Sequence, residues 1–239
     1  MAVKYKNPDL SGIMNVYKEK GMTSHDVVAA IRRLTGAKTG HAGTLDPDAE
    51  GVLVVLLGKC TKLSGKLMDG GKVYRAVCKL GETTDTQDAS GVTLRRRPAV
   101  CGLDEIVRAC SGFAGGYEQV PPMYSALKVG GRKLYDIARA GGEVERAARF
   151  VRIDGIRVEA FDPPDRFTMR VECGKGTYIR TLCADIGEEL GCGAHMESLV
   201  RLSVGKYSAG DAVTLGRLRE LAAQGRLSGA IMDGGGPIG

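Results

Sequence analysis

The chain has 239 residues, of which 43% are hydrophobic and 26% are charged. This composition is typical of a folded globular protein with one large domain or two small ones. No run of about 18 uninterrupted apolar residues occurs, which excludes a membrane-spanning helix. The first residues lack the apolar stretch of a secretory signal, so we expect a cytoplasmic protein. The net charge of +6 is compatible with an anionic partner such as nucleic acid.

The cysteines argue against both a disulfide framework and a metal site. Seven are present without a Cys-x-x-Cys pair, and only three histidines accompany them. Zinc sites and disulfide-rich domains need closer and more regular spacings than these. We therefore expect most of the thiols to be small buried apolar groups.

The first half of the chain predicts strands and helices around one long loop. A strand precedes a helix over residues 23–36, which Thr23 or Ser24 caps and Gly36 ends. Residues 38–50 are dense in Gly, Thr, Asp and Pro and are expected to form a loop that leads into a buried strand over residues 52–57. A half-buried strand is expected over residues 73–80. One face of the helix expected between these two strands carries a positive stripe of Lys59, Lys62 and Lys66.

The second half begins with a polar, turn-rich segment over residues 81–98. An irregular basic excursion follows a helix and occupies residues 115–142. The helices predicted here cover residues 103–113, 134–140, 177–191 with Thr177 as the cap, and 215–223. The strands predicted here cover residues 150–161 and 167–173. Strands and helices mixed in irregular order indicate an α+β fold, or an α/β fold with a mixed sheet.

The stretch most suggestive of chemistry is residues 40–51, GHAGTLDPDAEG. Asp46 lies between Leu45 and Pro47, so its backbone is restricted to extended geometry. Gly43 and Gly51 allow close backbone approach on either side. A carboxylate held firmly above a buried strand suits a nucleophile or a general base. An isolated Leu-Asp-Pro is more often an ordinary turn, so this stretch alone does not decide between the two.

Five segments in order resemble the TruB family, the bacterial tRNA pseudouridine-55 synthases. They read NVYKEKGMTSHDVV, GHAGTLDPDAEGVLVVLLGKCTKL, KVYRAVCKLGETTDTQDASG, QVPPMYSALKVGGRKLYDIARAG and ECGKGTYIRTLCADIGEELGCGAHMESLVRLSVG. The resemblance as a whole extends over roughly residues 15–218. The resemblance implies the pseudouridine synthase fold, an α+β fold with a mixed, largely antiparallel central sheet flanked by helices and a basic RNA-clasping insertion over about residues 95–150.

The resemblance also implies a division of the chain. Residues 1–218 would form the catalytic domain, and residues 219–239 a short C-terminal tail in place of the PUA-type domain into which bacterial members commonly continue. A further departure from the family is Lys18-Glu19 where members usually have Lys-Pro. This difference removes a rigid turn residue but no catalytic group.

The activity implied is isomerisation of a uridine to pseudouridine at position 55 in the T-loop of tRNA. The stacked base must be flipped out of the loop for this reaction. No atom is gained or lost, so no cofactor and no metal are expected. Asp46 would attack C1′ of the ribose or take the 2′ proton to give a glycal, and the sequence leaves both routes open. We expect a monomer whose partner is the T stem-loop.

The resemblance assigns roles to further residues. Arg180, in the Gly-x-Tyr-Ile-Arg segment, would keep Asp46 ionised, since burial alone would raise the pKa of that carboxyl group. Tyr74 would stack on the target base and help to remove the C5 proton. The side chains implied to bind the substrate are His41, which would contact the extruded nucleotide, and Tyr178 and Leu199, which would line the pocket. Contacts of the insertion with tRNA phosphates are expected from Lys128, Arg132, Lys133 and Arg139.

Two other functions fit parts of this sequence. A tRNA-binding folding chaperone would fit the charge but would not need the intact set of Asp46, Tyr74 and Arg180. An aspartate glycosyl hydrolase would normally have a second catalytic carboxylate. No second acid lies in a similarly constrained setting.

Overall fold

The computed structural model describes residues 6–125 and 127–233. The chain forms two compact units, and each is described by itself. Unit 1 comprises Met1–Tyr74 and Val200–Gly239, and unit 2 comprises Arg75–Leu199. The chain passes from one unit to the other inside two strands, β4 (Lys72–Leu80) and β13 (Ala194–Val204). The domain division expected from the sequence, with a catalytic domain over residues 1–218, stays a prediction.

Unit 1 contains a mixed sheet whose path runs β13–β3–β1–β15. Strand β1 is antiparallel to β3 and parallel to β15, and β13 is parallel to β3. Two short strands pair alongside this path, β2 with β3 and β14 with β13. The bounds are β1 (Gly12–Lys18), β2 (Thr39–Ala42), β3 (Glu50–Leu57), β14 (Tyr207–Ser208) and β15 (Val213–Thr214).

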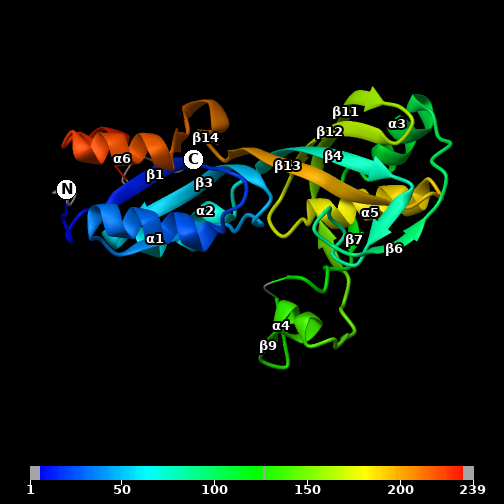
Figure 1. Ribbon diagram of the computed structural model, residues 1–239, viewed down its shortest axis with the longest axis horizontal. Coiled ribbons are helices and arrows are strands. Elements are labelled where there is room, and N and C mark those ends of the chain that lie inside the picture. Colours follow the sequence, from blue (N-terminus) through cyan, green and yellow to red (C-terminus); the bar gives the residue numbers. More distant parts are fainter. Residues whose placement is uncertain (1–5, 126, 234–239) are drawn as a thin grey trace. The chain divides into compact units, whose positions relative to one another are not determined.

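Helices cover both faces of this sheet (Figure 1). Alternate residues of β3 belong to two different hydrophobic clusters, because successive side chains of a strand point to opposite faces. One cluster includes α1 (Ser24–Thr35) and α6 (Leu215–Ala223), and the other includes Leu67 of α2 (Ser64–Met68). The buried strand predicted over residues 52–57 is therefore confirmed.

The predicted caps of α1 are present. The Thr23 side chain accepts a hydrogen bond from the Asp26 backbone N–H, and Gly36 ends the helix in the left-handed conformation with φ of 74°. The C-terminal part of unit 1 also contains two 3-10 turns, η2 (Ala209–Asp211) and η3 (Leu227–Ala230). Beyond η3, Met232 exchanges two backbone hydrogen bonds with Ile13 of β1, each of 2.8 Å.

Two sequence predictions for unit 1 were wrong. The stretch predicted as a loop over residues 38–50 begins with β2, whose residues Thr39–Ala42 pair with β3; cross-strand pairing decided this segment against its loop-like composition. The helix expected to carry one lysine stripe is instead a 3-10 turn, η1 (Gly58–Leu63), followed by α2. The two have different numbers of residues per turn, so Lys66 does not continue a single helical face from Lys59.

In unit 2 the sheet path runs β11–β12–β4–β13, with β11 (Ile153–Asp162) antiparallel to β12 (Arg166–Cys173). Two helices accompany this sheet, α3 (Leu103–Gly112) and α5 (Ile179–Glu189). Three strand pairs complete the unit: β5 (Glu82–Thr84) with β6 (Thr93–Arg96), β7 (Tyr117–Gln119) with β10 (Arg149–Val151), and β8 (Lys128–Val129) with β9 (Arg132–Lys133). Helix α4 (Leu134–Arg139) follows β9.

The thiols behave mostly as the sequence predicted. All seven are free, and five of them are buried in unit 2, namely Cys78, Cys110, Cys173, Cys183 and Cys192. Burial raises the pKa of Cys110 to about 12, which leaves this thiol protonated at neutral pH. These five buried cysteine side chains are therefore packing groups, whereas Cys101 of the same unit is only half-buried.

Unit 2 contains four departures from the sequence predictions. The polar segment over residues 81–98 holds the β5–β6 hairpin, and the strand expected over residues 150–161 is split into β10 and β11. The long strand β13 was not predicted at all. The residue that caps α5 is Tyr178, without a side-chain capping bond, whereas the Thr177 hydroxyl donates to the Gly174 carbonyl at 3.3 Å. The predicted class, α+β with a mixed central sheet and flanking helices, is confirmed.

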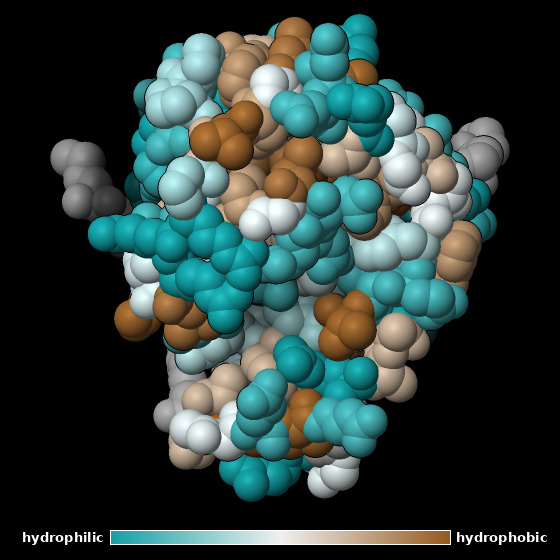
Figure 2. All heavy atoms as spheres, turned by 90° about the vertical axis from the view of Figure 1, so that its right-hand side faces the viewer, coloured by the Kyte–Doolittle hydropathy of each residue, from teal (hydrophilic) through white to brown (hydrophobic). Residues whose placement is uncertain are grey.

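The surface is mostly hydrophilic in the view of Figure 2, where brown hydrophobic residues form small groups separated by teal ones. The most exposed large hydrophobic side chains are Val92, Leu94, Val100 and Phe150. Within the described residues, no helix combines the length and the apolar character needed to cross a membrane.

Candidate active site

Asp46 lies half-buried in the loop that joins β2 to β3. The two strands form an antiparallel pair, with His41 opposite Val55 and Ala42 opposite Val54. Asp46 accepts a backbone hydrogen bond from Ala49 at 3.1 Å, which closes a turn after Pro47. The loop is therefore an ordered connection that leads directly into the most buried strand of unit 1.

Helix α1 anchors the residue before Asp46. Leu45 is buried, and its N–H donates to the Ser24 hydroxyl at 2.9 Å while its carbonyl accepts from the same hydroxyl at 3.0 Å. On the other side of Asp46, the Pro47 carbonyl accepts from the Gly21 N–H at 3.0 Å. These bonds fix the backbone on both sides of the carboxylate, as pre-organisation of a reactive group requires.

Two buried cations hold the same loop. Lys18 is fully buried and its ammonium donates to the carbonyls of Glu19, Pro47 and Ala49 at 3.1, 2.9 and 2.6 Å. Burial lowers the pKa of Lys18, and the nearby carboxylates of Asp48, Glu50 and Asp46 act in the opposite direction. Arg201, on β13, is 1% exposed and donates to three further carbonyls, those of Val52, Thr44 and Gly43.

Gly51 allows the start of β3 to lie against the backbone of Arg201 on β13. Its φ is +104°, and a Cβ at this position would lie 2.2 Å from the Arg201 carbonyl oxygen and 2.8 Å from its nitrogen. Both atoms are backbone and cannot move aside cheaply. The close approach that the sequence suggested for this glycine is therefore present.

His41, on β2 of unit 1, is a neutral imidazole near pH 7. Burial lowers its pKa, and the positive charge of Arg201 lowers it further. Within the described part of the chain, its buried Nδ1 atom has no hydrogen-bond partner. A neutral imidazole has one donor and one acceptor nitrogen.

In unit 2, Arg180 is the second residue of α5 and is only 6% exposed. Its Nη1 atom lies 3.4 Å from the Asp88 carboxylate, and its Nη2 atom donates to the Tyr124 carbonyl. Asp88 is itself oriented by Thr86 and Ser90, whose hydroxyls donate to its Oδ1 atom at 2.7 and 2.6 Å. The sequence reasoning assigned no role to Asp88, although it lies in the TDTQDASG stretch of one family-like segment.

Tyr178 lies at the N-terminus of the same helix, with its ring centroid 5.9 Å from the Arg180 guanidinium. The buried Gln119 amide holds the Tyr178 backbone, since Oε1 accepts from the Tyr178 N–H at 2.8 Å and Nε2 donates to the Tyr178 carbonyl at 3.1 Å. Nε2 also donates to the Tyr117 hydroxyl, which donates to Asp185 of α5, each at 2.6 Å. This network connects β7 to the N-terminus of α5 at Tyr178 and to Asp185 further along the helix.

The remaining candidate residues fall in both units. Tyr74 is 7% exposed and ends unit 1 on β4, and Leu199 is 8% exposed and ends unit 2 on β13. Asp46 and His41 share the β2–β3 hairpin of unit 1, and Arg180 and Tyr178 share α5 of unit 2.

The basic excursion forms the β8–β9 hairpin and α4, a segment outside the sheet of unit 2 (Figure 1). Arg132 is exposed in this hairpin. The side chains of Lys128, Lys133 and Arg139 lie outside the described part of the structure. The contacts predicted between these four residues and RNA stay predictions.

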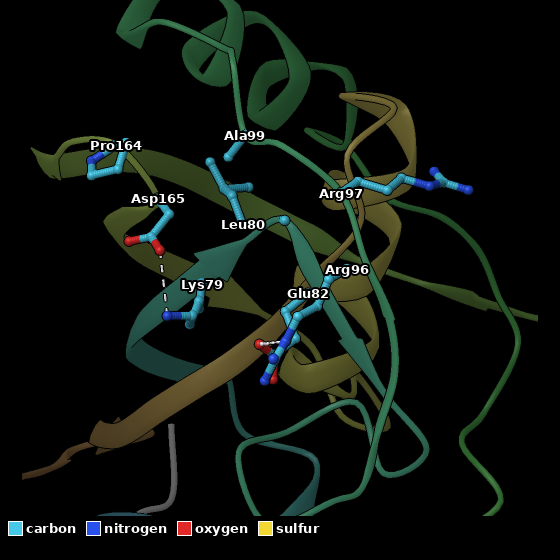
Figure 3. Close-up of a pocket in the computed structure, with 9 residues that line it drawn as sticks. Lys79, Leu80, Glu82, Arg96, Arg97, Ala99, Pro164 and Asp165 are labelled. Carbon is cyan, nitrogen blue, oxygen red and sulfur yellow. Dashed lines mark hydrogen bonds and ion pairs between the residues drawn. The ribbon is translucent and has the colours of Figure 1, made fainter.

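A separate hollow of about 260 Å³ lies at the end of β4 in unit 2 (Figure 3). Four of its charged side chains form two pairs, Lys79 with Asp165 at 3.3 Å and Arg96 with Glu82 at 3.0 Å, whereas Arg97 lies 3.9 Å from Glu188, which is not part of the lining. None of the residues predicted for the site lines it. Within residues 6–125 and 127–233, no group of three or more His, Cys, Asp or Glu side chains is arranged to hold a metal ion.

Comparison with known proteins identifies the class. Residues 32–179 match the model of the TruB family pseudouridylate synthase N-terminal domain, and residues 180–232 match that of the tRNA pseudouridylate synthase B C-terminal domain. The fold and the two matches define a pseudouridylate synthase.

Relatives with curated names agree. A tRNA pseudouridine synthase B of Alkaliphilus oremlandii (strain OhILAs) is 49% identical over 214 residues, which cover 89% of this chain and 71% of that protein. The protein of the same name from Streptococcus gordonii (strain Challis) is 47% identical, over 90% of this chain and 76% of its own length. The chain belongs to the TruB family.

Solved structures share the fold. A chain of a Cbf5-Nop10-Gar1 complex superposes with a TM-score of 0.73 at 31% identity and is matched over 93% of this chain. A chain of an H/ACA RNP bound to a substrate RNA containing 2′-deoxyuridine gives 0.69 at 27% identity over 95% of this chain. The present chain spans 60% and 65% of the lengths of these two chains.

Proposed function

We propose that this chain converts a uridine of tRNA to pseudouridine at position 55 of the T-loop, with Asp46 as the group that attacks the ribose. The relatives named tRNA pseudouridine synthase B support tRNA as the substrate. The observation that carries the assignment of Asp46 is its loop, whose backbone is hydrogen-bonded on both sides by Ser24 and Lys18. A backbone held in this way restricts where the Asp46 carboxylate can lie, so less freedom is lost when it meets its substrate.

The chemistry needs one fixed anion. In the first route the Asp46 carboxylate bonds to C1′ as the C1′–N1 bond breaks, and the freed uracil turns until C5 faces the sugar. The C1′–C5 bond then forms as the aspartyl ester bond breaks, C5 loses its proton and N1 gains one. In the second route Asp46 removes the C2′ proton as the C1′–N1 bond breaks, which gives a glycal and a free uracil anion. The C1′–C5 bond then forms as the proton returns to C2′, after which C5 loses its proton and N1 gains one. Both routes begin with the same ionised side chain.

Arg180 is proposed to supply the positive charge that keeps Asp46 ionised at the uridine. A guanidinium is charged at any relevant pH and presents its donors in a rigid fork. The contacts with Asp88 and the Tyr124 carbonyl orient that fork. Asp88 then acts through Arg180 as a positioning residue. Its negative charge also compensates part of the positive charge that Arg180 brings into a buried position.

Binding of the flipped nucleotide is proposed to fall to residues of both units. Tyr74 would stack on the base and help to remove the C5 proton, and neutral His41 would contact the extruded nucleotide. Tyr178 and Leu199 would add packing surface. The insertion residues Lys128, Arg132, Lys133 and Arg139 would contact tRNA phosphates, which makes affinity decrease steeply with salt. The protein would act as a monomer, in the cytoplasm.

Tritium release tests this function directly. The wild-type protein should release tritium from a tRNA transcript labelled at uridine C5, and should release none attributable to position 55 from a transcript with cytidine there. Asp46→Asn should lower turnover on the order of 10³-fold or more, with tRNA binding within about twofold of wild type.

Asp48→Asn is the matched control for this test. It lies two residues further along the same loop and is exposed, and it should retain turnover close to that of wild type. Turnover by Asp46→Asn at the level of Asp48→Asn would remove Asp46 from the mechanism. Loss of binding rather than turnover would assign Asp46 to RNA contact.

A further inference from the structure

Arg201 is a charged side chain in an interior position. Its residue is 1% exposed, and it is among the largest fully buried side chains of the protein. Its Nε atom donates to the Val52 carbonyl at 2.8 Å, Nη2 to the Gly43 carbonyl at 3.0 Å and Nη1 to the Thr44 carbonyl at 3.3 Å. Within the described residues, its hydrogen bonds all go to main-chain carbonyls and it forms no ion pair with a carboxylate.

Such a placement is costly. A guanidinium remains protonated in proteins, so burial cannot neutralise it. Desolvation of a charge is offset only by good hydrogen bonds or by nearby opposite charge. A leucine or methionine would fill the same interior space without this cost. The desolvation cost of Arg201 therefore indicates that this position needs a guanidinium for a reason other than packing.

The three carbonyls show what the side chain achieves. Gly43 and Thr44 belong to the loop and lie three and two residues before Asp46, whereas Val52 lies in β3, after the loop has ended. One planar fork thus joins the two ends of the loop across its base. The Gly43 carbonyl is available because this residue has φ of +94°, which a side-chain-bearing residue rarely adopts.

The positive charge of Arg201 also lies beside the segment that carries the Asp46 carboxylate. On the opposite side of Asp46, the fully buried ammonium of Lys18 holds the carbonyls of Pro47 and Ala49. Two interior cations therefore bracket the short segment that carries the carboxylate, and both contribute positive potential there.

We propose that Arg201 is a positioning residue for pseudouridine formation, which ties both ends of the Asp46 loop together and fixes the direction of the carboxylate. This inference rests on the proposed catalytic role of Asp46. Arg201 touches neither substrate nor reacting atoms in this role. Its fork geometry matters as well as its charge, because three different nitrogens of one rigid plane each meet a different carbonyl, and a lysine ammonium has only one nitrogen.

The test compares Arg201→Lys and Arg201→Met with wild type in the full-length chain. Turnover is measured by single-turnover tritium release, tRNA affinity by filter binding and the folded fraction by circular dichroism. Leu218→Ala, which opens a cavity in the α6 core of the same unit, is the control for loss of stability alone. Asp46→Asn is measured in parallel.

We expect turnover per folded molecule to decrease about 10²-fold in both variants, since a misplacement of about 1 Å is enough for such a loss. Affinity for tRNA should remain within twofold of wild type, and Leu218→Ala should keep wild-type turnover per folded molecule. Wild-type turnover in the folded Arg201 variants, with Asp46→Asn inactive, would overturn this inference and leave the proposed function intact. An active Asp46→Asn would instead contradict the proposed function itself.

If neither Arg201 variant folds, Gly43→Ala decides. It leaves Arg201 in place, and its Cβ would lie at an ordinary 3.6 Å from Nη1, but it strains the backbone that presents the carbonyl. Lower turnover at unchanged tRNA affinity supports the inference. Wild-type turnover in this variant overturns it.

Discussion

Replacing Gln119 by leucine should destabilise unit 2 by about 2 kcal/mol. The side chain is 1% exposed and makes three hydrogen bonds, two with the Tyr178 backbone and one with the Tyr117 hydroxyl. At about 1 kcal/mol net for each bond the loss is about 3 kcal/mol, and the apolar surface of a buried leucine returns on the order of 1 kcal/mol. For a chain of this length the melting temperature should decrease by roughly 4–8 °C.

Urea unfolding followed by circular dichroism measures this change. Gln224→Leu is the control, because Gln224 is exposed at the end of α6 and its replacement should alter the free energy of unfolding by less than about 0.5 kcal/mol. Gln119→Glu keeps the acceptor for the Tyr178 N–H but has no proton for the Tyr178 carbonyl or the Tyr117 hydroxyl, so it should be destabilised at neutral pH as well. A free energy of unfolding for Gln119→Leu equal to that of Gln224→Leu would refute the assignment of this network as the support of α5.

Three further outcomes follow from individual contacts. Asp88→Asn removes the carboxylate 3.4 Å from Arg180, so turnover in tritium release should decrease about tenfold or more while tRNA affinity in filter binding stays within about twofold; equal losses of both would assign the pair to RNA binding. Burial and a neighbouring cation lower the pKa of His41 in the folded state, so below pH 6.5 the unfolded chain binds more protons than the folded chain. The free energy of unfolding should therefore decrease as the pH falls from 6.5 through the folded-state pKa. In a series of urea-unfolding curves at different pH, His41→Gln should flatten this decrease, and an unchanged slope would contradict the assignment. Gly51→Ala should lower the melting temperature far more than Gly21→Ala. Both glycines have positive φ, but a Cβ at Gly51 would meet backbone at 2.2 Å, whereas a Cβ at Gly21 would meet nothing within 4 Å. Equal decreases in melting temperature would show that backbone strain, and not the close approach to β13, determines the loss of stability.

Local signals predicted the regular elements well. Thr23 and Gly36 mark the two ends of α1, and the valine-rich run of β3 has the buried character expected of a strand covered on both faces. Helix α6 begins and ends where its spacing indicated. These elements were predictable because capping, helical periodicity and burial act within a few neighbouring residues.

The elements that depend on distant partners were not predictable in the same way. Strand β13 contains Glu197 and Arg201, whose charges break the apolar pattern, and it is a strand because it pairs with β3 and with unit 2 neighbours far away in the sequence. β2 has a loop-like composition and is a strand through its pairing with β3. Single-sequence patterns contain no information about such pairings.

The residues of the candidate site also separate into those that the sequence indicated and those that it did not. Asp46 could be singled out from its Leu-Asp-Pro setting between glycines, and its family resemblance pointed to Arg180. Asp88, Lys18 and Arg201 gave no comparable signal, because a charged residue in a sequence is normally taken as exposed. Their positions under the Asp46 loop or beside Arg180 became visible only when the carbonyls and carboxylates they contact were located.

The measurement that tests the account most directly is a map of pseudouridine in tRNA after incubation with wild-type protein, Asp46→Asn or Asp48→Asn. Carbodiimide modification followed by primer extension locates each pseudouridine. We expect one new stop, at position 55, with wild type and Asp48→Asn and none with Asp46→Asn. A stop at another position, or an equal stop with Asp46→Asn, would contradict the central claim that this fixed carboxylate isomerises the T-loop uridine.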